Sequence, residues 1–104
     1  MKATTQLRNL LKEPGMLTVP GCYDSVTALI NKHLGFKAVY IGGFAAEAVM
    51  LGHPDMGLKT LTETTVQAGR IADAVDLPVI CDGEGGFGSY INICLLYTSP
   101  SPRD

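Results

Sequence analysis

The feature that most constrains this chain is the segment at residues 78–88, an apolar run that ends in two acidic residues among glycines. The run from Pro78 to Cys81 is too short for a helix and is typical of a parallel strand buried on both faces. Asp82 and Glu84 follow it directly. Because ligands of parallel α/β folds bind beyond the carboxyl ends of the strands, these two carboxylates are expected at a ligand site.

The residues of this acidic loop are open to three interpretations. Carboxylates at i and i+2 suit Mg²⁺, which takes oxygen ligands from one or two carboxylates and completes its shell with water and substrate. Asp and Gly are also ordinary turn residues, so a solvated loop is the second interpretation. The third is a dinucleotide site, because Gly83, Gly85 and Gly88 spell G-x-G-x-x-G. The acidic side chains inside that motif would repel phosphate, which disfavours the third interpretation.

The rest of the chain alternates strands with helices. The order predicted from periodicity and turn residues is a helix ending at Pro14, a strand at 16–19, a helix from Asp24 to Gly35, a strand at 36–41, a short helix at 45–50, a long helix from Thr60 to before Leu77, and the strand at 78–81. This alternation demands parallel pairing with right-handed crossovers. About three βα units fit, whereas a complete (β/α)₈ barrel needs roughly 200 to 250 residues. The predicted fold class is therefore α/β, the truncated N-terminal portion of a TIM barrel.

Helix boundaries can also be predicted from capping residues. Thr4 or Thr5 is expected to cap the first helix, Asp24 the second, and a Thr60–Glu63 capping box the long one. The second helix is expected to bury the face formed by Val26, Leu29, Ile30 and His33. Residues 94–104 lack a helical period and contain Ser-Pro-Ser-Pro, so a non-family tail of frameshift or adapter origin is expected after residue 93.

Composition excludes several functional classes. The net charge of −2 without a basic run disfavours nucleic acid and anionic membranes as partners, and no apolar stretch is long enough to span a membrane. Three widely spaced cysteines without a C-x-x-C pair argue against a disulfide framework or structural zinc. They fit a reducing, cytoplasmic location.

Two further candidate positions follow the second predicted strand. Gly42 and Gly43 precede the short helix, so the N–H groups near Gly43 and Phe44 point towards the strand ends and are able to bind a carboxylate; the alternative is a tight βα turn. Asp55 lies in a Pro-Asp-x-Gly turn and is either a third acidic ligand or only a turn residue.

Four segments in this order resemble the isocitrate lyase / phosphoenolpyruvate mutase superfamily, and most of all its methylisocitrate lyase, dimethylmalate lyase and carboxyphosphonoenolpyruvate mutase branch. The segments are residues 20–24, 35–40, 51–57 and 82–88. The resemblance runs from about Leu7 to Asn92 and implies a (β/α)₈ barrel that forms a homotetramer at full length. It also implies Mg²⁺-dependent cleavage or rearrangement of small 2-oxo or 2-hydroxy carboxylates.

The resemblance also implies roles for individual residues. The family's carboxylate-binding Tyr-x-Ser-Gly-Gly stretch falls on Tyr40, Gly42, Gly43 and Phe44, so the serine and the second glycine are replaced. Its Asp-Ala-Asp loop falls on Asp82, Gly83 and Glu84, so that Glu84 stands for the direct Mg²⁺ ligand. Asp82 is implied at both the metal and the substrate. Asp55 is implied as a carboxylate that orients the metal or the substrate.

The family's general acid is a cysteine in a Lys-Lys-Cys-Gly-His segment, and no such segment occurs in the chain. No catalytic residue is therefore expected here, and the 104 residues are expected to be inactive alone. The leading prediction is an Mg²⁺-dependent C–C lyase on a hydroxy or oxo di- or tricarboxylate. Rivals of the same fold are an oxaloacetate decarboxylase or hydrolase and a phosphonopyruvate-forming mutase. A non-catalytic binding protein is the rival from another class.

Overall fold

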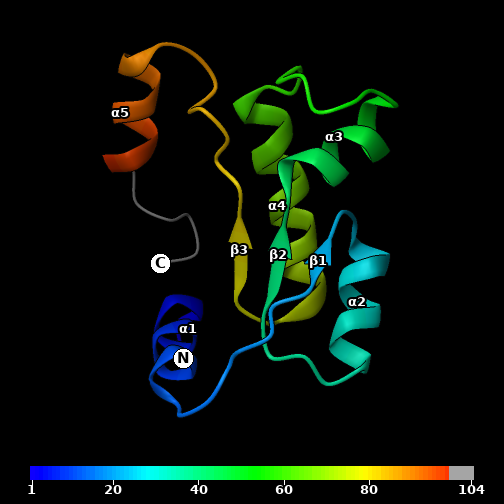
Figure 1. Cartoon of the computed structure of the whole chain (residues 1–104), viewed down its shortest axis with the longest axis vertical. Helices are drawn as coiled ribbons and strands as arrows, with labels where there is room; N and C mark the ends of the chain where they lie inside the picture. Colours follow the sequence, from blue (N-terminus) through cyan, green and yellow to red (C-terminus); the bar gives the residue numbers. More distant parts are fainter. Residues whose placement is uncertain (99–104) are drawn as a thin grey trace.

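The computed structural model describes residues 1–98. Its elements in chain order are α1 (Ala3–Lys12), β1 (Gly21–Cys22), α2 (Ser25–His33), β2 (Val39–Ile41), α3 (Gly43–Leu51), α4 (Leu61–Val75), β3 (Val79–Cys81) and α5 (Tyr90–Thr98). The predicted α/β class is confirmed. Figure 1 shows the three strands side by side, with their carboxyl ends towards α3 and the α3–α4 loop.

The sheet is parallel throughout, in the order β1-β2-β3. Tyr40 lies opposite Gly21 on one side and opposite Ile80 on the other. The ladder continues beyond β3, because the Asp82 N–H donates to the Ile41 carbonyl at 2.9 Å. The predicted parallel pairing is confirmed, and the pairing brings the ends of β2 and β3 together.

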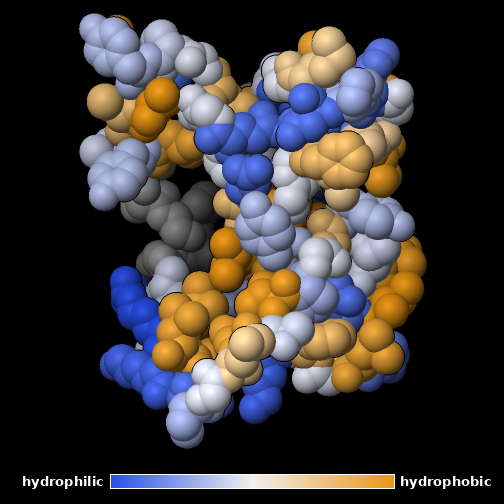
Figure 2. Space-filling view, in the orientation of Figure 1, coloured by the Kyte–Doolittle hydropathy of each residue, from blue (hydrophilic) through white to orange (hydrophobic). Residues whose placement is uncertain are grey.

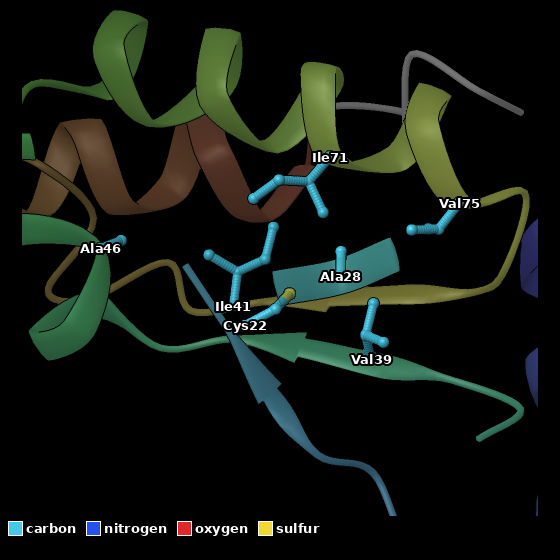
Figure 3. Packing of buried hydrophobic residues seen from close by; sticks show 7 residues of the cluster. All are labelled: Cys22, Ala28, Val39, Ile41, Ala46, Ile71 and Val75. Carbon is cyan, nitrogen blue, oxygen red and sulfur yellow. The ribbon is translucent and has the colours of Figure 1, made fainter. Parts of the chain in front are cut away.

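The hydrophobic core lies between the sheet and the helices α2 and α4. Its buried members, shown in Figure 3, are Cys22, Ala28, Val39, Ile41, Ala46, Ile71 and Val75. Ile71 and Val75 extend from α4 towards the strand side chains, as the one-face spacing of that helix predicted. This layer fixes β2 and β3 against α4, and therefore fixes the loops that follow both strands.

The other face of the sheet is not covered in the part of the chain that the structure describes. Along β2, Val39 and Ile41 are buried while Tyr40 between them is exposed. In β3, Val79 and Ile80 are half-buried and Cys81 is exposed, so the prediction of a strand buried on both faces was wrong. A parallel strand reads as continuously apolar because it is buried on both faces in a complete fold. The apolar run of β3 therefore indicates burial on both faces in a complete fold, whereas residues 1–98 leave this strand partly exposed.

The first strand lies later than predicted. Residues 16–19 are not a strand; β1 begins at Gly21, and the carbonyl of Pro20 accepts a hydrogen bond from the Tyr40 N–H at 2.9 Å. Side-chain preference marks a segment that fits a pleated surface, but pairing with β2 decides which residues form the strand. Cys22, which lies beyond the strand predicted at 16–19, consequently belongs to β1 and is buried.

Helix α2 also packs differently from the prediction. Val26, Leu29, Ile30 and His33 are exposed, and the residue that enters the core is Ala28. A small side chain allows α2 to lie close to α4 and β1, which are its neighbours in the fold. The apolar stripe therefore faces away from the core, among the residues that the structure describes.

The predicted caps of the two later helices are confirmed. Asp24 Oδ1 accepts from the Thr27 N–H at 2.8 Å, and Thr60 forms a reciprocal capping box with Glu63. The predicted cap of the first helix was wrong. Helix α1 begins at Ala3, so both threonines lie inside it, and the residue at the N-cap position is Lys2, whose side chain forms no capping hydrogen bond. Pro14 and Gly15 lie just beyond its end, as predicted.

The segment after the acidic loop is helical. Helix α5 reaches Thr98, so the predicted lack of helix from residue 94 was wrong for residues 94–98. Its periodicity was hidden because apolar side chains occur all around it. The rest of the predicted tail, residues 99–104, lies outside the described residues. Within residues 1–98, no helix combines the length and the apolar character needed to cross a membrane.

Candidate functional site

The candidate site lies where β2 and β3 end. Helix α3 begins two residues after β2, and the acidic loop begins directly after β3, so sheet pairing places both at one edge. In the view of Figure 2, hydrophilic residues gather around this upper end and hydrophobic ones cover much of the lower half. The distribution matches a polar site at the carboxyl ends of the strands.

Asp82 links the two strand ends. Its Oδ2 accepts from the Gly43 N–H, in the first turn of α3, at 3.4 Å. Its Oδ1 accepts from the Glu84 N–H at 2.7 Å. A carboxylate at the start of α3 is favoured by the unpaired N–H groups and by the helix dipole. Asp82 therefore orients the acidic loop against α3.

Three other carboxylates gather beside it. One oxygen each from Glu47, Asp55 and Glu84 lie within 4.8 Å of one another. Glu47 extends from α3 and is fully buried, and its Oε1 accepts from the Leu58 N–H at 2.6 Å. Its Oε2 is buried and has no hydrogen-bond partner among residues 1–98. An orphaned carboxylate oxygen beside two further carboxylates fits an oxygen-binding divalent cation, because burying an unpaired charge is otherwise costly.

The position of Glu84 in the carboxylate cluster affects both its backbone conformation and the pKa of its carboxyl. Its φ of 48° lies in the left-handed region, which costs a non-glycine residue roughly 1 to 2 kcal/mol. Burial raises the pKa of its carboxyl, and the negative charges of Glu47, Asp55 and Asp82 raise it further, while Lys59 opposes them. A cation held by the three carboxylates would reverse this repulsion.

Gly43 allows the carboxylates to approach α3. A Cβ built at this position would lie 2.6 Å from Glu84 Oε1 and 3.0 Å from Asp82 Oδ2. Any side chain here displaces both groups. The two carboxylates approach so closely that this position has room only for glycine. A tight βα turn, the alternative predicted from the sequence, does not by itself explain this requirement.

A hollow of about 490 Å³ opens beside the cluster. It is lined by residues 57–61 and by Glu84, Gly85, Phe87 and Gly88. Lys59 is the one cation of this lining, and only 4% of its surface is exposed. The hollow therefore combines the Glu84 carboxylate with the almost fully buried Lys59.

Cys22 and Cys81 do not supply a low-pKa thiol to the site. Burial is the main cause that raises the pKa of Cys22 to about 11, with Asp24 and Cys81 adding to it. Burial also raises the pKa of Cys81, which ends β3 and donates to the Asp82 carbonyl with Sγ 3.7 Å away. Both thiols are protonated at neutral pH.

The structure brings some predicted site residues together and leaves others apart. Asp55 and Glu84 share the carboxylate cluster, whereas Asp82 lies outside it and binds backbone N–H groups. Gly43 contacts Asp82 directly. The remaining predicted substrate-binding residues lie next to this point: Tyr40 in β2, Gly42 before α3, and Phe44, which is exposed, in its first turn.

Glu47 and Lys59 were missed from the sequence. Glu47 is the one charged residue in the otherwise apolar helix α3, and that isolated charge was the signal that pointed to it. Lys59 carries no such signal, because a lysine in a loop is normally solvated. Its burial depends on the loop between α3 and α4.

Comparison with known proteins supports a relationship over most of the chain. The profile of the phosphoenolpyruvate phosphomutase family matches residues 7–94. The chain is 41% identical over 93 residues to 2,3-dimethylmalate lyase of Eubacterium barkeri, covering 89% of this chain and 32% of that protein. It is 40% identical over 88 residues to 2-methylisocitrate lyase of Halalkalibacterium halodurans, covering 85% and 29% respectively.

Solved structures agree with this relationship. The crystal structure of oxaloacetate acetylhydrolase superposes with a TM-score of 0.80 at 33% identity, covering 88% of this chain and 33% of that one. Phosphonopyruvate hydrolase, solved with oxalate and Mg²⁺, superposes with a TM-score of 0.81 at 25% identity, covering 89% and 32%.

The chain thus spans about a third of the length of the relatives it matches. The described strands, helices and acidic loop all fall within the matched region, apart from the chain's first residues and the end of α5. On the family profile, the ordered motifs and the superposed fold, the chain belongs to the phosphoenolpyruvate phosphomutase family of the phosphoenolpyruvate mutase / isocitrate lyase superfamily.

Proposed function

We propose that the protein containing this chain is an Mg²⁺-dependent C–C bond lyase that acts on a 2-hydroxy or 2-oxo di- or tricarboxylate. The observation that carries the proposal is the cluster of Glu47, Asp55 and Glu84, with one buried carboxylate oxygen of Glu47 left unpartnered among residues 1–98. The family relationship supports the reaction class, because its curated members include 2,3-dimethylmalate lyase and 2-methylisocitrate lyase.

In this proposal Glu47, Asp55 and Glu84 hold the Mg²⁺, either directly or through water. An ion held by these residues would supply Lewis-acid stabilisation of the negative charge that develops on substrate oxygens when a C–C bond next to a carbinol breaks. Asp82 is not needed as a ligand for this role, since its oxygens already fix the loop to α3.

The chain's own backbone positions the substrate. The Gly43 N–H already donates to Asp82 Oδ2, so the Phe44 N–H in the same first turn of α3 is the donor suited to a substrate carboxylate. Such fixed donors need no reorganisation as charge develops. Tyr40 and Gly42 bound this position from the end of β2. The proton donor to the departing carbanion is proposed to come from outside this chain.

The experiment that tests the lyase assignment uses the protein expressed from the full reading frame of the source gene. The purified protein is given 2-methylisocitrate and 2,3-dimethylmalate with Mg²⁺ or with EDTA. Cleavage that requires Mg²⁺ and is lost in Glu84→Gln is expected. Asp73→Asn, an exposed carboxylate on α4, serves as the control and is expected to retain activity. Full cleavage in EDTA, or in Glu84→Gln, contradicts the proposal.

A second candidate is an oxaloacetate decarboxylase or hydrolase of the same fold. It is favoured by the superposition on oxaloacetate acetylhydrolase at 33% identity. Inclusion of oxaloacetate in the same substrate panel separates them. A lyase splits a branched hydroxy acid into two carbon-containing products, a decarboxylase releases CO₂ from oxaloacetate, and a hydrolase releases oxalate and acetate from it.

A further inference from the structure

Lys59 is a lysine held in place and almost fully buried next to the carboxylate cluster. The residue before it, Leu58, donates its N–H to Glu47, and the residue after it, Thr60, is the N-cap of α4. These two contacts fix the backbone on both sides of Lys59. Only 4% of Lys59 is exposed, although lysine side chains are rarely buried without a partner.

The ammonium group of Lys59 has no local anion of its own. It makes no hydrogen bond or ion pair with any of residues 1–98. Its charge nevertheless acts across the strand ends, since it lowers the pKa of both Cys81 and Glu84 against the effect of burial. A lysine that is almost fully buried and acts on the Glu84 carboxyl, yet pairs with no described residue, is expected to bind an incoming anion strongly.

The hollow beside the cluster offers one position for such an anion. Of its lining residues, Lys59 and Glu84 are the charged ones, and they come from the α3–α4 loop and the acidic loop. The hydroxyl of Thr60 is not a second donor to such an anion, because it already donates its hydrogen bond to Glu63 Oε1 at 3.1 Å. An anionic group in the hollow therefore has Lys59 as its cationic contact within the described lining.

We propose that Lys59 binds the substrate carboxylate that lies away from the carboxylate cluster, and that it thereby selects dicarboxylates over monocarboxylates. The inference rests on the proposed function, because it assumes that the other end of the substrate lies at the cluster. It adds a specificity-determining residue on the α3–α4 loop. The competing role is structural: Lys59 only offsets the negative charge of the carboxylates.

Binding of two small hydroxy acids separates these roles. Malate and lactate are both 2-hydroxy acids, and malate carries the additional carboxylate. Their affinities are measured by calorimetry with Mg²⁺ on the protein expressed from the full reading frame of the source gene. The proteins compared are the wild type, Lys59→Met, Lys59→Arg and Lys37→Met, the last an exposed lysine control. Mg²⁺ affinity and the thermal midpoint are measured for each.

The expected result is a loss of malate affinity of about tenfold or more in Lys59→Met, as for other charged hydrogen bonds. Lactate and Mg²⁺ affinities should stay within about threefold, and Lys59→Arg should retain most malate affinity, since it keeps the charge. Lys37→Met should behave as the wild type. These results support the proposal.

Three results overturn it. Equal malate affinity in the wild type and Lys59→Met refutes the role of Lys59 in specificity but does not contradict the proposed metal site. A similar loss of malate, lactate and Mg²⁺ binding in both Lys59 variants shows the structural role instead. Absence of any Mg²⁺ binding in the wild type overturns the proposed function itself, and this inference with it.

Discussion

At the scale of single residues, Gly43 sets how closely the acidic loop approaches α3. We expect Gly43→Ala to displace the carboxylates of Glu84 and Asp82 and to weaken Mg²⁺ binding about tenfold, because a Cβ there would lie 2.6 Å from Glu84 Oε1 and would misplace the metal-binding groups. Global stability should change little, since the displaced groups are side-chain ends. Calorimetric titration with Mg²⁺ measures the effect.

The control is Gly69→Ala in α4, where a Cβ meets nothing within 4 Å. It should stabilise the protein by about 0.5 to 1 kcal/mol and leave Mg²⁺ binding unchanged. Unaltered Mg²⁺ affinity in Gly43→Ala would show that the carboxylates do not need their present positions.

The pKa of Glu84 predicts an opposite pH dependence for stability and for metal binding. Because the folded-state pKa is raised, the folded protein binds more protons than the unfolded chain between the two pKa values. The metal-free protein should therefore lose stability as pH rises through the folded pKa, whereas its Mg²⁺ affinity should increase. Glu84→Gln should remove this loss of stability and abolish tight Mg²⁺ binding.

Thermal midpoints in EDTA across a pH series check the first half of this prediction, and Mg²⁺ titrations at the same pH values check the second. If the thermal midpoint of the metal-free protein has the same pH dependence in the wild type and in Glu84→Gln, then repulsion between Glu84 and its neighbouring carboxylates does not affect stability as proposed.

At the scale of elements, the start of α4 depends on its capping box. The Thr60 hydroxyl oxygen accepts from the Glu63 N–H at 3.1 Å, and Glu63 Oε1 accepts from the Thr60 N–H at 3.1 Å. Thr60→Ala should destabilise the first turn by about 1 kcal/mol, which speeds amide exchange there roughly fivefold. Hydrogen exchange measures this, with Thr62→Ala as the exposed control. Equal exchange in both variants would exclude a capping role.

At the scale of the whole molecule, the described residues leave much apolar surface uncovered. One face of the sheet is open, and α2 and α5 present exposed apolar side chains, among them Val26, Ile30, Ile91 and Leu95. We expect the 104-residue chain expressed alone to aggregate or to form a molten state that binds a hydrophobic dye. Sedimentation and a thermal scan test this. A monomer with a sharp, cooperative transition would contradict it.

The sequence by itself determined the elements that depend on local chemistry. The caps at Asp24 and Thr60, the left-handed Gly35 after α2, and the one-face spacing of α4 follow from interactions within a few residues. The parallel order also follows, because alternating strands and helices leave few other connections. Glu84 was a candidate because it follows a strand end, whereas Asp55 lies in the α3–α4 loop and was a candidate through its acidic turn and the family resemblance.

Only the tertiary structure decided which side chains meet. Pairing with β2 moved the first strand to Gly21, and close packing against α4 put Ala28 in the core in place of the apolar stripe of α2. Glu47 and Lys59 are distant in sequence from Glu84, yet the α3–α4 loop brings all three to one edge of the sheet. Burial and the resulting charge interactions depend on contacts across the fold, and local sequence patterns do not encode them.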